Sequence, residues 1–252
     1  MALDAAARLP GNGMALEKAL ESYIAISVKC PASILVLVAF LVLPWSLQAD
    51  TAPDKFTTFF VGRLKFANDP GTTCGKVAEE LGHLLSRAST ITVQDEKKIR
   101  LADDDTLYET PFLFMDGHDD FVLSDVEIGN LRRYFAHGGF MLASGCCSNT
   151  GFPIAWRREM NRVFPGESVQ KIPYDHLIYH AFYNLDHVTN LANHEDVLLD
   201  GLYHDGELVA VMCPDGLVCS FAMGNECNKG KGIDPEEGRK LALNIAVYSL
   251  TH

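Results

Sequence analysis

Two adjacent cysteines, Cys146 and Cys147, are the residues whose type and position most favour chemistry. They follow Gly145, and the surrounding pattern predicts a strand before them and a helix after them. A nucleophile elbow has the pattern Gly-x-nucleophile-x-Gly at such a turn, and here Asn149 stands in place of the last glycine. Asparagine tolerates a left-handed backbone better than most residues. The sequence therefore allows Cys147 to act as a thiol nucleophile.

A histidine at the end of the preceding predicted strand could act as the general base toward Cys147. That strand ends in Gly117, His118 and Asp119. If the two strands are parallel neighbours, their carboxyl ends meet at one edge of the sheet, where open α/β sheets bind ligands. His118 would then activate the thiol, and Asp119, Asp120 or Asp175 could orient the imidazole.

Other interpretations of the same residues remain open. The cysteines could simply pack the end of a strand, or they could be disulfide partners in an exported protein. The candidate catalytic residues are Cys147, His118 and Asp119, and the candidate ligand-binding residues are Cys146, Gly117, Asp175 and His176.

Metal binding is an alternative of a different class, because zinc accepts thiolate, imidazole and carboxylate ligands. Residues of these types near the predicted site are His118, Asp119, Cys146, Cys147, His176 and His180. The chain contains neither a Cys-x-x-Cys nor a His-Glu-x-x-His motif, so the spacing assigns no metal ligand and no cofactor.

A glycine- and lysine-rich segment, residues 224–232, precedes the last predicted helix. It does not have the spacing of a phosphate-binding loop, because five residues rather than four separate Gly224 from Gly230. In addition, Gly232 rather than Ser or Thr follows Lys231. We interpret the segment as a surface turn whose lysines could attract an anion.

The elements that would position these residues alternate between strand and helix patterns. Strands are predicted near 56–66, 99–101, 111–115 and 140–143, and helices near 77–85, 124–137 and 154–164. Ser124 and Glu127 have the spacing of a capping box at the start of one helix, which Gly138 ends. This alternation predicts parallel strands with right-handed crossovers.

The C-terminal part departs from that alternation. Residues 170–200 show no clean period and are expected to be irregular. Two Asp-Gly turns then separate the apolar runs 201–203, 208–212 and 217–221, which predicts an antiparallel meander. Asp234, Pro235 and Glu237 open a final helix. The expected fold class is α/β, three-layer α/β/α and flavodoxin-like, with a mostly parallel sheet plus this C-terminal antiparallel meander.

Composition limits the classes of partner. The chain has 252 residues, is 48% hydrophobic and carries a formal net charge of -12, all of it in residues 50–252. Nucleic acid is excluded as a partner, because its phosphates require clustered Lys and Arg. One domain of ordinary size is expected over residues 50–252.

Residues 1–49 have the character of a leader. The stretch 30–49 carries no charge, and residues 32–45 are mostly apolar. A signal peptide cleaved before Asp50 is the preferred interpretation, and an uncleaved membrane anchor formed by residues 30–49 is the alternative. Met14 is an alternative start to Met1. Both interpretations predict export across the inner membrane into the periplasm or cell envelope, with membrane contact only through the N-terminal segment.

Several short blocks carry a family resemblance. They are residues 62–66, 111–118, 131–140, 146–147 and 173–176. Together they resemble domain-of-unknown-function family 4159 over nearly all of residues 56–250. The resemblance implies a sheet of the class I glutamine amidotransferase-like kind, often in exported or membrane-attached bacterial proteins, and it implies no activity. Amidotransferases pair their elbow cysteine with a late His and Glu, whereas here Glu226 has no companion His and His252 is the last residue.

The primary hypothesis from sequence is a non-catalytic domain that binds an unknown small ligand or protein partner. A thiol-dependent hydrolase or amidase using Cys147 with His118 is the second hypothesis. A metal-binding domain is the third.

Overall fold

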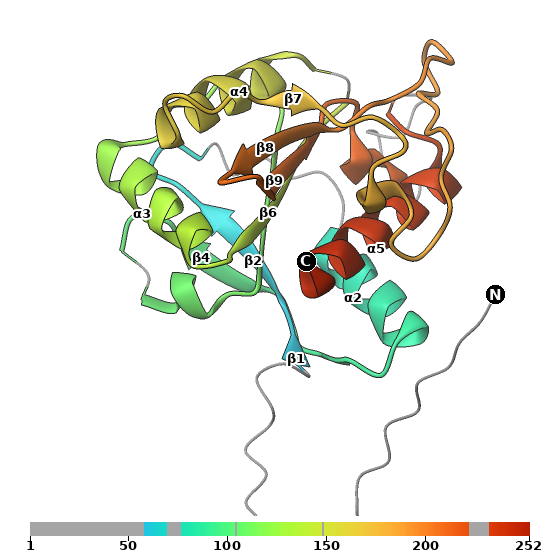
Figure 1. The fold of residues 1–252 in the computed structure, drawn as a ribbon, viewed down its shortest axis with the longest axis horizontal. Coiled ribbons are helices and arrows are strands. Elements are labelled where there is room, and N and C mark those ends of the chain that lie inside the picture. Colours follow the sequence, from blue (N-terminus) through green and yellow to red (C-terminus); the bar gives the residue numbers. More distant parts are fainter. Residues whose placement is uncertain (1–57, 70–76, 104, 148, 222–231) are drawn as a thin grey trace, which may run out of the picture. The chain divides into compact units, whose positions relative to one another are not determined.

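A seven-stranded sheet organises the part of the chain that the computed structural model describes, residues 58–69, 77–103, 105–147, 149–221 and 232–252 (Figure 1). All of these residues belong to the compact unit Thr51–His252. Across the sheet the strands follow the order β4 (Lys97–Arg100), β2 (Val61–Lys65), β5 (Phe112–Gly117), β6 (Phe140–Gly145), β9 (Glu207–Cys213), β8 (Asp200–His204) and β7 (Gln170–Lys171). A separate parallel pair joins β1 (Thr58–Phe59) to β3 (Thr92–Val93).

The first five strands of the sheet are parallel to one another. In chain order β4 is the second of these five strands. It pairs with one side of β2, and β5, β6 and β9 follow on the other side of β2. This is the 2-1-3-4-5 order of flavodoxin-like folds. The predicted α/β class with a mostly parallel sheet is therefore confirmed.

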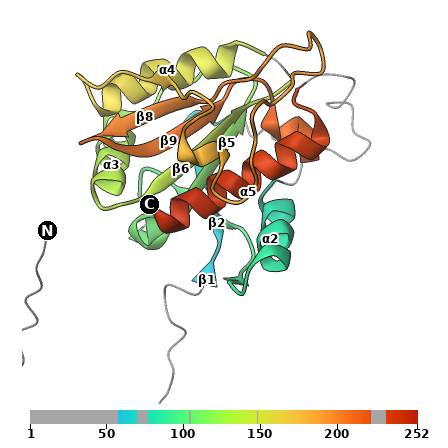
Figure 2. The ribbon, with the colours of Figure 1, turned by 45° about the vertical axis from the view of Figure 1, so that its right-hand side comes forward.

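Helices cover both faces of the sheet. α2 (Val77–Ala88) and α5 (Pro235–Thr251) lie on one face, and α3 (Asp125–Ala136) and α4 (Gly151–Val163) lie on the other (Figure 2). The side chains of β5 alternate accordingly: Phe112 and Phe114 join the core beneath α2 and α5, whereas Leu113 and Met115 join the core beneath α3 and α4. A strand that is buried on both faces has a continuous apolar run in its sequence, and β5 has such a run.

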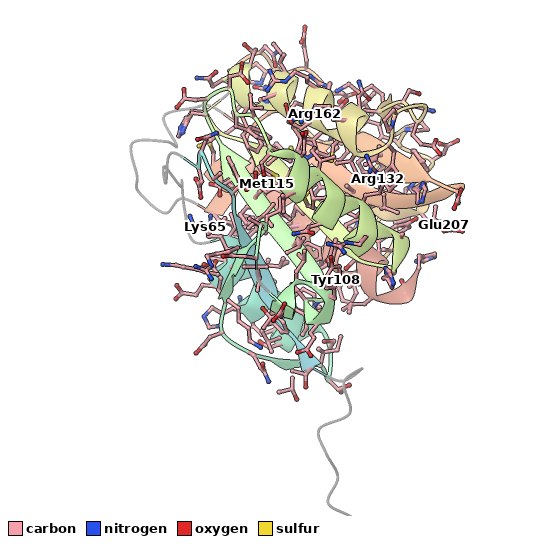
Figure 3. The ribbon with its side chains drawn as sticks, turned by 90° about the vertical axis from the view of Figure 1, so that its left-hand side faces the viewer. Lys65, Tyr108, Met115, Arg132, Arg162 and Glu207 are labelled. Atoms are coloured by element: carbon pink, nitrogen blue, oxygen red, sulfur yellow. The ribbon has the colours of Figure 1, made fainter. Side chains whose placement is uncertain are left out.

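Arg132 connects the two helices of the second face, which Figure 3 views from outside. Its Nε donates to the carbonyl of Val163 at 2.7 Å, and its Nη2 donates to the carbonyl of Arg162 at 3.1 Å. These carbonyls lie in the last turn of α4, where backbone carbonyls have no amide donor within the helix. The guanidinium therefore both caps α4 and holds α3 against it.

The predicted helix starts are confirmed. The Ser124 hydroxyl accepts from the Glu127 amide at 3.3 Å, and the Glu127 carboxylate accepts from the Ser124 amide at 2.7 Å. At the start of α5 the Asp234 side chain accepts from the amides of Glu236 and Glu237. Both caps satisfy amides that a helix leaves without partners.

The antiparallel part of the sheet is confirmed with one correction. β8 and β9 form a hairpin whose turn residues Asp205 and Gly206 both have positive φ, and β7 pairs antiparallel with β8. The prediction of a strand over residues 217–221 is wrong, because these residues form the 3-10 helix η4 (Leu217–Phe221). A short apolar run does not distinguish a buried strand from a buried helical turn.

The region 170–200 is irregular as predicted, apart from β7 and the 3-10 helix η3 (Leu177–Tyr179); a further 3-10 helix, η2 (Asp105–Glu109), precedes β5. The expected leader, with its candidate membrane segment 30–49, lies outside the described residues, as does the glycine-rich stretch 224–231. Within the described ranges, no helix is both long and apolar enough to cross a membrane.

Candidate functional site

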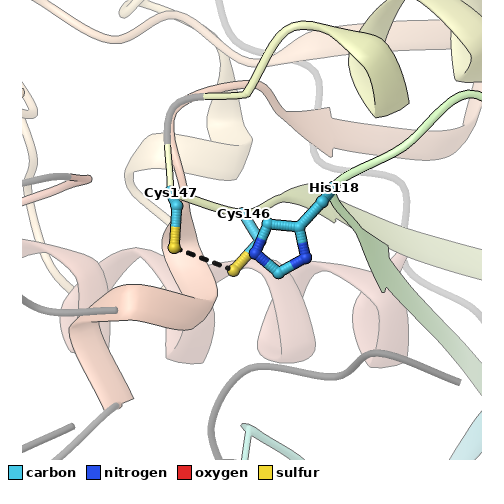
Figure 4. A group of neighbouring side chains, drawn as sticks. All are labelled: His118, Cys146 and Cys147. Carbon is cyan, nitrogen blue, oxygen red and sulfur yellow. Dashed lines mark hydrogen bonds between the residues drawn. The ribbon is translucent and has the colours of Figure 1, made fainter. Parts of the chain in front are cut away.

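Three cysteine thiols and one imidazole lie at the carboxyl edge of the sheet. His118 follows β5, Cys146 and Cys147 follow β6, and Cys219 lies on η4, which follows β9. Because these three strands are parallel neighbours, the residues after them meet at one edge. We call the four side chains the thiol–imidazole cluster. Figure 4 shows three of them, with the His118 ring beside the sulfur of Cys146.

The two adjacent cysteines face each other. Their Sγ atoms lie 3.5 Å apart. Cys147 has a φ of 55°, in the left-handed region that non-glycine residues rarely adopt. Along an extended strand, neighbouring side chains point to opposite faces. The backbone turn at Cys147 therefore redirects its side chain to the side on which Cys146 lies.

Cys219 joins the pair from a distant part of the chain. Its Sγ accepts from the Cys147 amide at 3.4 Å. Hydrogen bonding with Cys146 lowers the pKa of the Cys219 thiol to about 6, against the effect of burial and with the help of hydrogen bonds from Cys147. The cluster thus favours a thiolate at this position.

Close backbone packing brings Cys219 to this place. Gly216 has a φ of 80°, and a Cβ at this position would lie 3.1 Å from the Cys219 sulfur. The Cys219 amide donates to the Gly216 carbonyl at 3.0 Å, which starts the turn of η4. Gly216 therefore supplies both the conformation and the space that the sulfur needs.

His118 is the nitrogen donor of the cluster. One ligand atom each from His118, Cys146 and Cys147 lies within 4.8 Å of the others. The His118 side chain is partly exposed, whereas Cys146 is fully buried. The His118 carbonyl accepts from the Phe152 amide at 3.2 Å, so the first turn of α4 fixes the loop that carries the imidazole.

A buried ion pair lies next to the cluster in the sequence. Arg63 on β2 donates from Nη1 to Asp116 Oδ1 at 2.6 Å and from Nε to Glu96 Oε1 at 3.1 Å. Asp116 immediately precedes Gly117 and His118. Its charge opposes ionisation of the Cys219 thiol, although less than the hydrogen bonds promote it. The guanidinium, bound by two carboxylates, offsets part of that negative charge.

The sequence of this region matches a known family. The family described as Domain of unknown function (DUF4159) matches residues 62–250. The chain belongs to this family. The matched range contains all four side chains of the thiol–imidazole cluster, and the resemblance predicted from sequence is confirmed. A search of curated proteins finds no match to this DUF4159 chain.

The structure of the DUF4159 domain brings together some of the predicted site residues. Cys147, Cys146 and His118 meet, as the neighbouring strands suggested. Gly117 lies among buried atoms, and a Cβ there would lie 2.5 Å from the Phe152 ring, so this glycine allows close packing between β5 and α4. Asp119 is exposed and is not one of the residues whose ligand atoms converge in the described part of the chain.

Asp175 and His176 lie elsewhere in the domain. The His176 ring centroid is 5.6 Å from that of Tyr248, which in turn is 6.1 Å from that of Phe140. Phe140 begins β6, whereas the cysteines follow its end, roughly 20 Å away at about 3.3 Å per residue. His176 Nδ1 accepts from the Ile178 amide and caps η3, and burial lowers its pKa. These two residues are therefore not part of the cluster.

Cys219 is the member of the cluster that sequence reasoning missed. The sequence prediction placed it inside a strand, where its side chain would have packed into the sheet. The one sequence signal for it was its position after a strand and after the Asp215–Gly216 turn. Cys213, by contrast, ends β9 and is fully buried, and burial raises the pKa of its thiol to about 12.

Proposed function

We propose that this DUF4159 domain is a non-catalytic binding domain whose binding site is the thiol–imidazole cluster. The observation that supports this proposal best is the convergence of ligand atoms of His118, Cys146 and Cys147 within 4.8 Å of one another, with the Cys219 sulfur on the Cys147 amide beside them. A Cys–His nucleophile requires one thiol and one base. Two further sulfurs in contact with that thiol add donor atoms for a ligand and nothing to a proton transfer.

Exposure within the cluster supports the same proposal. Cys146 and Cys219 are buried, whereas Cys147 and His118 are partly exposed. A ligand could therefore reach the cluster from the solvent side and be held by donors that the fold has already arranged. Donors that are fixed before binding lose less entropy when the ligand arrives.

A thiol-dependent hydrolase or amidase is the second candidate function. It is favoured by the positive φ of Cys147, since a nucleophile elbow holds its nucleophile in such a turn between strand and helix. His118 is the base in this alternative. The amidotransferase-like relationship belongs to the same proposal, because the sheet order is compatible with it and the residues after β6 occupy the elbow position.

We also propose that the domain acts outside the cytoplasm, either exported or anchored through residues 30–49. The proposal is supported by the charge-free apolar stretch that follows Lys29. Fractionation of cells that produce the full chain tests it. Recovery in the periplasmic or membrane fraction is expected, and recovery with cytosolic proteins would contradict it.

Native mass spectrometry of the purified full chain tests the binding function. We expect the native mass to exceed the denatured mass by a bound ligand, and we expect Cys146→Ser and Cys147→Ser to lose that excess. The variant Asp119→Asn is the control, because Asp119 neighbours His118 but lies outside the cluster.

Hydrolysis of p-nitrophenyl acetate, measured on the same samples, distinguishes the alternative. If the native mass shows no excess and the hydrolysis disappears in Cys147→Ser, thiol catalysis would replace the proposed binding function. A sample with no excess mass and no hydrolysis would contradict both functions.

A further inference from the structure

We propose that the ligand of the thiol–imidazole cluster is a single Zn²⁺ ion, held by the converging ligand atoms of His118, Cys146 and Cys147 and completed by the Cys219 sulfur, which lies 3.4 Å from the Cys147 amide. This inference rests on the proposed binding function, because it names the ligand of that site. Three cysteines and one histidine are one of the standard ligand sets of four-coordinate zinc. Soft sulfur donors also disfavour Mg²⁺ and Ca²⁺, which prefer oxygen.

The sulfur spacing fits a shared metal. A Zn–S bond is about 2.3 Å long, so two sulfurs on one tetrahedral zinc are ~3.8 Å apart. The Sγ atoms of Cys146 and Cys147 are 3.5 Å apart, a few tenths of an ångström closer. A disulfide would require about 2.05 Å. The two sulfurs therefore need only a small shift to bind one ion.

The backbone conformation explains how the two sulfurs converge. Adjacent residues of an extended chain cannot direct their side chains to one point, and a non-glycine residue at φ 55° is disfavoured. That conformation at Cys147 produces the convergence of the two sulfurs. The energy of binding a metal offsets the cost of the conformation, whereas simple packing of a strand end would not require it.

Charge complementarity also favours a cation. Metal binding deprotonates thiols, and thiolates at this largely buried edge of the sheet would need a cation among them. The guanidinium of Arg63 is already bound by Asp116 and Glu96. A divalent cation at the centre of the cluster would offset the charge of the thiolates that bind it.

A zinc with four protein ligands has a structural role, because it has no open position for a substrate or water. The ion would tie the loop after β5, the loop after β6 and η4 to one another. It would also occupy the Cys147 sulfur, so that zinc binding and a free Cys147 nucleophile exclude each other.

Metal analysis of the purified full chain, before and after chelation, tests the inference. We expect about one zinc ion per chain as purified. After chelation, Co²⁺ should restore one site with the sulfur-to-cobalt charge-transfer band and the intense visible bands of tetrahedral sulfur ligation. Cys219→Ser should lower Zn²⁺ affinity at least ~10-fold, because one of the four ligands of the set is lost.

Two matched controls accompany these measurements. Cys213→Ala removes a buried cysteine outside the cluster and should keep the metal, as should Asp119→Asn. If the ligand variants fail to fold, the wild-type cobalt spectrum still decides, since bands without sulfur-to-cobalt charge transfer would overturn the thiolate site.

The remaining outcomes separate this inference from the proposed function. An organic ligand in the native mass without zinc binding would overturn the metal and leave the binding function intact. Zinc bound equally by wild type and by the Cys146, Cys147 and Cys219 variants would place the metal elsewhere and overturn the inference. A disulfide between Cys146 and Cys147 that air oxidation forms in the zinc-saturated protein would also overturn it.

Discussion

The sulfur atoms of Cys146 and Cys147 lie 3.5 Å apart although the two residues are adjacent in the chain. Their convergence depends on the left-handed backbone of Cys147, which turns its side chain away from the alternation of the preceding strand. The sulfur of Cys219, which lies 72 positions after Cys147 in the chain, accepts a hydrogen bond from the Cys147 amide and so brings a third thiol beside the pair. Several measurable consequences follow from this local geometry.

Alkylation should distinguish the described cysteines in metal-free, reduced protein. Cys147 is partly exposed, and we expect iodoacetamide to modify it first. Cys213 should remain unmodified in the folded protein at pH 8, because burial excludes the reagent and raises the pKa of the thiol to about 12. Mass-spectrometric site mapping at successive times measures both rates. Equal rates at Cys147 and Cys213 would contradict the described burial, and a denatured sample shows that both thiols can react.

Glycine should be tolerated better than alanine at position 147. Both substitutions remove the thiol, but only glycine adopts φ 55° without a steric cost from Cβ. We expect Cys147→Gly to be more stable than Cys147→Ala by ~1 kcal/mol. Urea unfolding of both variants in the presence of a chelator measures the difference. A more stable alanine variant would mean that the backbone at this position is not left-handed.

Crowding near Cys219 should make Gly216 less replaceable than Gly206. Both glycines have positive φ, 80° and 87°, so alanine costs roughly 1 kcal/mol of backbone strain at either. At Gly216 the new Cβ would also lie 3.1 Å from the Cys219 sulfur, whereas at Gly206 no described atom lies within 4 Å. We expect Gly216→Ala to have the larger loss of unfolding free energy and, unlike Gly206→Ala, a weakened zinc affinity. Equal effects of the two substitutions on both quantities would argue against the described packing of η4.

Removing Arg63 should be costly, because it breaks the ion pair of a buried carboxylate, that of Asp116. The Arg63 and Asp116 side chains are 8% and 1% exposed. We expect Arg63→Met to lower the free energy of unfolding by ~3 kcal/mol. Arg100→Met is the control, since the ion pair of Arg100 with Asp103 is largely exposed and should contribute less than ~1 kcal/mol. Comparable losses in the two variants, measured by urea unfolding, would show that Asp116 is solvated.

Local patterns in the sequence determined most of the secondary structure. The capping box at Ser124 and the Asp234–Pro235 helix start were predictable because a cap depends on residues within one helical turn. The buried strand β5 was predictable from its continuous apolar run. The alternation of strands with helices likewise fixed the α/β class and placed His118 near Cys146 and Cys147.

Only the tertiary structure determined which distant residues join the site. The apolar run 217–221 is compatible with a strand and with a buried helical turn. Packing against β6 and α5 selects the 3-10 helix that carries Cys219 to the cluster. The sequence likewise did not determine where Asp175 and His176 lie. The chain between β7 and β8 carries them to the other end of β6. Strand periodicity is a local property, whereas strand order and the path of irregular chain depend on burial summed over the whole core.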